Sequence, residues 1–216
     1  MEVRQIRRNS DLYPVQIHQR MGVMAPESIN VFGNLNILRH SRIGLICSIQ
    51  CPGSIVIKTF DLIRKLRDEG VVMIGGFHSP IERECLDLLL RGTQPVILCP
   101  ARGLRNLRMG KAARKATAEG RLLVFSIFGD EVRRTTATQG TLRNDIVSAL
   151  AKAILVPYAA QNGKTWNTVA RALGYGQKVF TVEDKANMNL IASGAWTYRD
   201  GQLDELLNEA KCLGGE

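Results

Sequence analysis

The sequence predicts an α/β fold with a doubly wound, mostly parallel, Rossmann-like sheet and helices on both faces. Two observations support this prediction. Short apolar runs, such as 42–48 (RIGLICS) and 94–99 (QPVILC), are continuous rather than alternating, which is typical of strands buried on both faces. Segments with apolar residues at helical spacing separate these runs. Because strand–helix–strand units join through right-handed crossovers, the alternation favours parallel strands covered by helices on each side.

The first half of the expected sheet comes from residues 42–99. Strand 42–48 precedes a helix over 55–68, in which Val56, Phe60 and Ile63 share one face. Strand 71–75 (VVMIG) then leads into a second helix, and strand 94–99 follows. The second helix is expected because Ile81, Cys85, Leu88 and Leu89 stand at helical spacing.

The second half continues the alternation. A basic helix is expected over 106–119, since Gly120 suits the position that follows a helix C-terminus. Further strands are expected at 122–127, 153–157 and 178–182, and further helices at 142–151, 166–173 and 204–212. The chain is thus expected to form one domain. Residues 1–40 are an N-terminal extension packing on the core, 41–200 are the Rossmann-like core, and 201–216 carry a C-terminal helix.

Charge and cysteine content limit the function classes. The 216 residues include 29 Lys and Arg against 20 Asp and Glu, for a formal net charge of +9, which favours a polyanionic partner. A charged N-terminus and the lack of an 18-residue apolar run argue against a secretory signal and a membrane span. Five cysteines without zinc-type spacing predict reduced thiols, a cytoplasmic protein and no metal site.

A glycine-bearing loop at residues 75–82 (GGFHSPIE) closes one strand and opens a helix. Ser79 fits the N-cap of that helix, Pro80 its first position, and Glu82 completes a capping box. Free amides at such a helix start also bind phosphate. The candidate ligand-contacting residues of this loop are Gly75, Gly76, His78 and Ser79.

A second loop, 162–165 (NGKT), follows the strand at 153–157. It is similar to the end of a P-loop, but Tyr158 stands where a Walker motif has its first glycine. Gly163, Lys164 and Thr165 still suit a phosphate, and a plain helix start is the alternative. No G-x-G-x-x-G follows strand 42–48, so no dinucleotide cofactor is expected. Ligands of doubly wound sheets bind at the carboxyl ends of the strands, where both loops stand.

Basic residues form a third candidate feature. The expected helix over 106–119 places Arg108, Lys111 and Lys115 on one face, and Arg105 adds charge nearby. Such a strip can track a phosphate backbone, although a solvated helix face gives the same pattern. Arg143 belongs to a further basic cluster after the loop at 128–140.

With these motifs in order, the chain resembles the DNA-processing protein A (Smf/DprA) family from about Asp11 to Tyr198. The arginine that this family carries in a "GsR" motif after its first core strand is replaced here by Ile49-Gln50. The segments that carry the resemblance are Tyr13-Pro14, 29–38 (INVFGNLNIL), 43–48 (IGLICS), 75–89, 143–147 (RNDIV), 163–168, 176–182 and 187–195 (NMNLIASGA).

The resemblance implies a Rossmann-like core that binds single-stranded DNA. It further implies a role in DNA recombination and natural transformation, with loading of the RecA recombinase, and a homodimer. No catalytic activity and no cofactor are expected. By position, the binding groove would be lined by Ser48, Gly76, Arg143, Asn144, Gly163, Lys164 and Thr165.

The alternative is a protein or enzyme of the wider superfamily that binds a nucleotide or another phosphate ligand. The "Lonely guy" phosphoribohydrolases of that superfamily carry a P-G-G-x-G-T-x-x-E loop. The matching residues here, 159–169, contain one glycine and no glutamate. This difference argues against hydrolysis and leaves nucleotide binding open.

Overall fold

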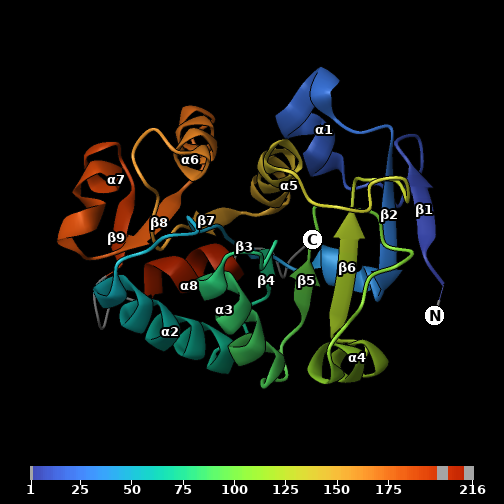
Figure 1. The fold of residues 1–216 in the computed structure, drawn as a ribbon, viewed down its shortest axis with the longest axis horizontal. Helices are drawn as coiled ribbons and strands as arrows, with labels where there is room; N and C mark the ends of the chain where they lie inside the picture. Colours follow the sequence, from blue (N-terminus) through green and yellow to red (C-terminus); the bar gives the residue numbers. More distant parts are fainter. Residues whose placement is uncertain (1, 199–203, 212–216) are drawn as a thin grey trace.

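A nine-stranded sheet forms the centre of the computed structural model, which describes residues 2–198 and 204–211 (Figure 1). Its strands lie in the order β1-β2-β6-β5-β4-β3-β7-β8-β9. Strands β3 to β9 are parallel to their neighbours, and β1 and β2 are antiparallel. The predicted fold class is confirmed. The strands are β1 Arg4–Arg7, β2 Ser28–Gly33, β3 Ile43–Leu45, β4 Met73–Gly75, β5 Val96–Leu98, β6 Leu122–Ser126, β7 Ala153–Leu155, β8 Val179–Val182 and β9 Trp196–Tyr198.

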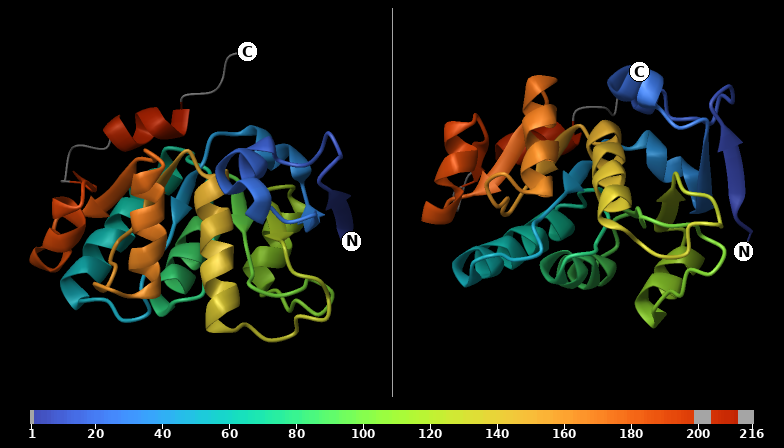
Figure 2. Two further views of the ribbon diagram at one scale, coloured as in Figure 1. Left: turned by 90° about the horizontal axis from the view of Figure 1, so that it is seen from above. Right: turned by 45° about the horizontal axis from the view of Figure 1, so that its top comes forward.

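Helices cover both faces of the sheet (Figures 1 and 2). Helices α2, α3 and α4 pack on one face, and α1, α5 and α6 pack on the other. The α-helices are α1 Val15–Met21, α2 Gly53–Asp68, α3 Pro80–Leu90, α4 Lys111–Ala118, α5 Ala137–Leu150, α6 Lys164–Gly174, α7 Met188–Ala192 and α8 Asp204–Lys211. Three 3₁₀ turns are Gly22–Met24, Leu35–Arg39 and Lys185–Asn187.

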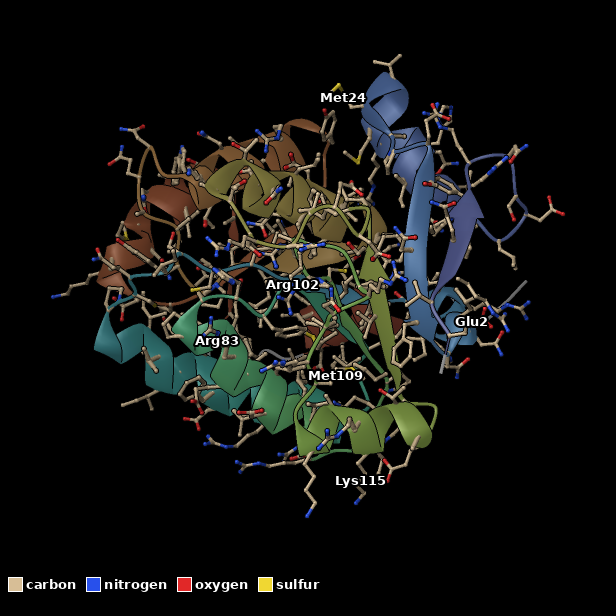
Figure 3. All side chains as sticks on the ribbon, turned by 45° about the vertical axis from the view of Figure 1, so that its right-hand side comes forward. Glu2, Met24, Arg83, Arg102, Met109 and Lys115 are labelled. Carbon is tan, nitrogen blue, oxygen red and sulfur yellow. The ribbon has the colours of Figure 1, made fainter. Side chains whose placement is uncertain are left out.

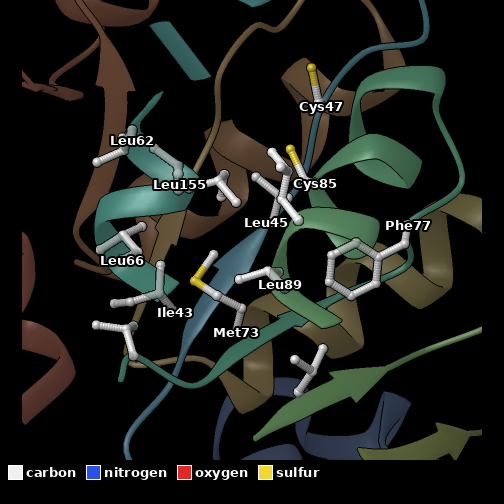
Figure 4. Close-up of a cluster of buried hydrophobic side chains, with 14 of the residues drawn as sticks. Ile43, Leu45, Cys47, Leu62, Leu66, Met73, Phe77, Cys85, Leu89 and Leu155 are labelled. Carbon is white, nitrogen blue, oxygen red and sulfur yellow. The ribbon is translucent and has the colours of Figure 1, made fainter. Parts of the chain in front are cut away.

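The two faces enclose separate hydrophobic cores. Leu155 of β7 belongs to the core under α2 and α3, which Figure 4 shows in close-up with Leu45, Met73 and Leu89. Its neighbour Ile154 belongs to the core under α5 and α6. Successive strand residues therefore pack in opposite directions, which explains why the strand sequences are apolar throughout.

The strand order reverses between β3 and β7. From β3 the chain adds β4, β5 and β6 on one side, and it then crosses to add β7, β8 and β9 on the other. The loops after β3 and β7 consequently leave their strands in opposite directions. In doubly wound sheets this divergence opens a crevice at the carboxyl ends of the strands.

The terminal segments join the same structure. Residues 28–33 alternate between buried and less buried positions, with Ile29 and Val31 inside. They pair with β6, and β1 pairs with them at the sheet edge. At the other end, Leu206 and Leu207 of α8 reach the first core, and the Ser41 hydroxyl donates to the Glu209 carbonyl (3.0 Å).

Three helix starts differ from the predictions. The basic helix begins at Lys111 rather than at 106, because Leu104 is buried and Leu107 packs on the core in a turn before it. Helix α5 begins at Ala137 rather than 142, because Thr136 and Gln139 form a capping box. Helix α6 begins at Lys164 rather than 166. The predicted end of the last helix, Cys212, lies outside the described residues.

Candidate functional site

A pocket lies where the strand order reverses. Its wall comes from the loops that follow β3, β4 and β7 and from the first turns of α5. This is the position at which doubly wound sheets bind ligands. Seven of the predicted site residues line it: Ser48, His78, Ser79, Arg143, Asn144, Lys164 and Thr165.

Arg143 is the buried cation of this pocket. Only 6% of the residue is exposed, and it has no acidic partner within 4.0 Å in the described part of the chain. Its Nε donates to Asn144 Oδ1 (2.8 Å) and its Nη1 donates to the Cys99 carbonyl (3.1 Å). Burial lowers its pKa, because the charged form is poorly solvated. Its Nη2 donates to no group among the described residues and stays accessible.

Gly76 makes room for this guanidinium. A Cβ added at Gly76 would lie 1.1 Å from Arg143 Nη1 and 1.7 Å from Arg143 Cζ. The glycine is therefore needed for close packing of the arginine. Gly75 similarly packs against Phe77, 3.1 Å from a would-be Cβ. Neither glycine lines the pocket, so the expected direct approach of a ligand to this turn is replaced by support of Arg143.

Glu82 occupies the amides at the start of α3. Its Oε2 accepts from the backbone N of His78 (2.8 Å) and of Ser79 (2.9 Å), and its Oε1 accepts from the backbone N of Cys47 (2.9 Å). The Ser79 hydroxyl accepts from the Glu82 amide (3.3 Å), so the predicted capping box is confirmed. The expectation that a phosphate binds free amides here is corrected, because a carboxylate already takes them.

The start of α6 offers what α3 does not. Its N-cap, Gly163, makes no side-chain cap, and the amides of Lys164 and Thr165 donate to no acceptor in the described chain. The preceding Asn162 holds the left-handed conformation at φ 61°. The Ser48 hydroxyl accepts from the Ala160 amide (3.1 Å), which ties the β3 and β7 loops together. Unpaired amides at a helix start are suited to bind an anion.

The family is decided by comparison with known proteins. The model of the family described as DNA recombination-mediator protein A matches residues 4–211. The chain belongs to this family. The resemblance predicted from the motifs is thus confirmed. A comparison with curated protein sequences gives no match.

Solved structures share the fold of this DNA recombination-mediator family member. DNA processing protein A (DprA) from Streptococcus pneumoniae is 21% identical, with a TM-score of 0.80 over 97% of this chain and 75% of that chain. The Helicobacter pylori protein, whose structure is described in terms of its single-stranded DNA binding mode, is 16% identical, with a TM-score of 0.75 over 97% of each chain. A molybdenum cofactor binding protein from Rippkaea orientalis is 15% identical, with a TM-score of 0.56 over 78% of this chain and 96% of that chain.

Four of the predicted basic residues in this family member lie outside the pocket. Arg105 and Arg108 are exposed in the segment before α4, and Lys111 and Lys115 are exposed on α4 itself. Figure 3 shows Lys115 projecting from the outer side of that helix. These four residues, here called the α4 strip, do not line the pocket at the strand reversal.

Sequence analysis missed part of the pocket wall in this DNA recombination-mediator protein. Thr135, Thr136, Gly140 and Thr141 line it from the start of α5, where a loop was expected. The Thr136-x-x-Gln139 capping box was the available signal. Ile49, which stands in the region of the missing "GsR" arginine, also lines the pocket and is 69% exposed.

Metal and membrane features were also examined in the described residues. Within 2–198 and 204–211, no three His, Cys, Asp or Glu residues are placed to hold a metal ion. In the same ranges, no helix has the length and apolar character that a bilayer crossing needs.

Proposed function

We propose that this protein binds single-stranded DNA and that a backbone phosphate enters the pocket between Arg143 and the start of α6. The observation that carries the proposal is a buried guanidinium without an acidic partner beside two unpaired amides. Burial of a cation costs several kcal/mol when nothing compensates its charge. A phosphate would supply that compensation and would accept from Arg143 Nη2 and from the amides of Lys164 and Thr165.

The remaining pocket wall suits a single strand. Ser48, Thr136 and Asn144 present neutral hydroxyl and amide groups, which can pair with sugars and with the exposed edges of unpaired bases. The α4 strip would contact phosphates elsewhere along the strand and supply a sequence-independent share of the affinity. The net charge of +9 and the DNA-binding mode described for the Helicobacter pylori relative support this assignment.

We further propose a role in DNA recombination and natural transformation, in which a cytoplasmic homodimer loads the RecA recombinase onto the bound strand. Family membership supports this role. Light scattering during gel filtration tests the dimer. A RecA-dependent strand-exchange assay tests the loading, and a rate that does not change when the protein is added would contradict it.

The binding proposal is tested by fluorescence anisotropy with a labelled single-stranded oligonucleotide. We expect micromolar or tighter binding at about 50 mM salt, and weaker binding as salt rises. Lys164→Met should reduce affinity about tenfold, which is the loss expected for one charge-assisted phosphate contact. The matched control is Arg39→Met, which removes the same charge from an exposed position outside the pocket.

Two results would count against the assignment. One is the absence of binding at micromolar protein, and the other is an equal effect of the Lys164 and Arg39 variants. Nucleoside monophosphates serve as competitors in the same assay. If a monophosphate saturates the pocket while the oligonucleotide does not bind, or if free base is released, the alternative class of nucleotide-binding protein or phosphoribohydrolase replaces the DNA proposal.

A further inference from the structure

Two cysteines bracket the pocket loop at residues 48–50. Cys47 follows β3, lines the pocket and is 6% exposed. Cys51 stands directly before the N-cap of α2 and is partly exposed. The thiol of Cys47 forms a side-chain hydrogen bond with the sulfur of Cys51. The two sulfurs are therefore neighbours in the folded protein.

The surroundings make Cys51 the more reactive thiol. The hydrogen bond from Cys47 lowers the pKa of Cys51, while the same bond and burial raise the pKa of Cys47 well above its ordinary value. Helix α2 is 16 residues long and has no side-chain cap at Pro52, so its positive end also favours a thiolate at Cys51. Asp184, the acidic group that faces Cys51, opposes this effect and does not reverse it.

The other described cysteines are less suited to react. Cys85 and Cys99 are both buried, and burial raises the pKa of Cys85 strongly and that of Cys99 to about 12. A thiol, in contrast to a thiolate, is a poor nucleophile. Reactivity among the described cysteines should thus be confined to the pair beside the pocket.

We propose that Cys47 and Cys51 are a hydroperoxide-sensitive dithiol whose oxidation to a disulfide remodels the pocket wall. The Cys51 thiolate attacks one oxygen of hydrogen peroxide, the O–O bond breaks, and hydroxide leaves and is protonated to water. The Cys51 sulfenic acid then reacts with Cys47, which forms the S–S bond, breaks the S–O bond and releases a second water. Two thiols and one peroxide thus give one disulfide and two waters.

The disulfide would close a ring around Ser48, Ile49 and Gln50, which line the pocket. Cys47 is held by its backbone hydrogen bond to Glu82, and the Ser48 hydroxyl accepts from the Ala160 amide. Drawing the two sulfurs to bonding distance must move this loop against those contacts. We expect weaker binding of the ligand, and this effect on DNA rests on the function proposed above.

Peptide mapping tests the disulfide without any ligand. The full chain is treated with hydrogen peroxide, unfolded, alkylated with N-ethylmaleimide and digested with trypsin. Cys47 and Cys51 fall on the single tryptic peptide 43–58, whereas Cys85 and Cys99 fall on two other peptides and serve as internal references. We expect peptide 43–58 to lack both alkyl groups and to regain them after reduction. Alkylation of both cysteines in peptide 43–58 after oxidation would overturn the proposal, as would loss of alkylation on the reference peptides first.

DNA affinity provides the second readout. Oxidised protein should bind the oligonucleotide at least about fivefold more weakly than reduced protein, a loss typical of a displaced site loop, and reduction should restore it. Cys51→Ser should bind like the reduced wild type with or without peroxide. If oxidation forms the disulfide and leaves affinity unchanged, the remodelling is refuted. If reduced protein binds no DNA while the disulfide forms, the DNA assignment fails and the dithiol stands.

Discussion

Gly76→Ala offers a stringent perturbation, because it changes one hydrogen to a methyl group in a place that Arg143 already fills. The new Cβ would lie 1.1 Å from Arg143 Nη1 and 2.5 Å from its Nε. The guanidinium cannot stay, and nothing about the backbone of Gly76 itself forbids alanine, since its φ lies outside the left-handed region. The substitution therefore tests the position of the arginine.

The expected cost follows from the contacts that Arg143 loses. The displaced guanidinium gives up its hydrogen bonds to the Cys99 carbonyl and to Asn144 Oδ1. Hydrogen bonds to charged groups contribute roughly 1.5–3 kcal/mol each, and the freed side chain regains part of this through water. A net loss of about 2–3 kcal/mol in the free energy of unfolding is expected. Binding of single-stranded DNA should fall about tenfold, because one phosphate partner is misplaced.

Urea denaturation and anisotropy titration measure the two effects. The control is Gly174→Ala, since Gly174 is an exposed helical residue with open space around it. Arg143→Ala and the double variant Gly76→Ala/Arg143→Ala complete a mutant cycle. With the arginine gone, alanine at 76 should add no further loss of stability. If Gly76→Ala costs the same with and without Arg143, the packing described here is wrong.

Three further predictions concern individual contacts. Glu82→Gln should lose about 2 kcal/mol in urea denaturation, because its amide group cannot accept from three backbone amides, whereas the exposed Glu84→Gln should change little. Asn162→Gly should keep stability within about 0.5 kcal/mol and Asn162→Val should lose at least about 1 kcal/mol, since φ is 61° there; equal stabilities would contradict the assigned backbone. Charge reversal at Arg108 and Lys111 should flatten the plot of log affinity against log salt by about two units of slope, and an unchanged slope would remove the α4 strip from the interface.

The central sheet could be predicted from sequence because its strands are buried on both faces. Continuous apolar runs such as 153–157 leave little ambiguity when helices separate them. Strands β1 and β2 escaped prediction for the opposite reason. They lie toward one edge, where β1 has the polar sequence RQIR with a single buried side chain. A short edge strand of this kind carries almost no hydrophobic pattern.

The site was predicted in outline, since the loops after β3, β4 and β7 follow from the topology. What spacing along the chain could not give is the long-range packing within it. Gly76 and Arg143 are distant in sequence, and only the folded structure shows one against the other. The interpretation of 75–82 as a phosphate loop failed because Glu82, recognised as a capping residue, also accepts from His78 and Cys47. A local motif does not show whether its amides are already used.

A crystal structure of the protein with a short single-stranded oligonucleotide would test the central claim most directly. The account predicts a phosphate oxygen within hydrogen-bonding distance of Arg143 Nη2 and of the amides of Lys164 and Thr165. DNA ordered on another surface, such as the α4 strip, with the pocket free of phosphate would contradict it.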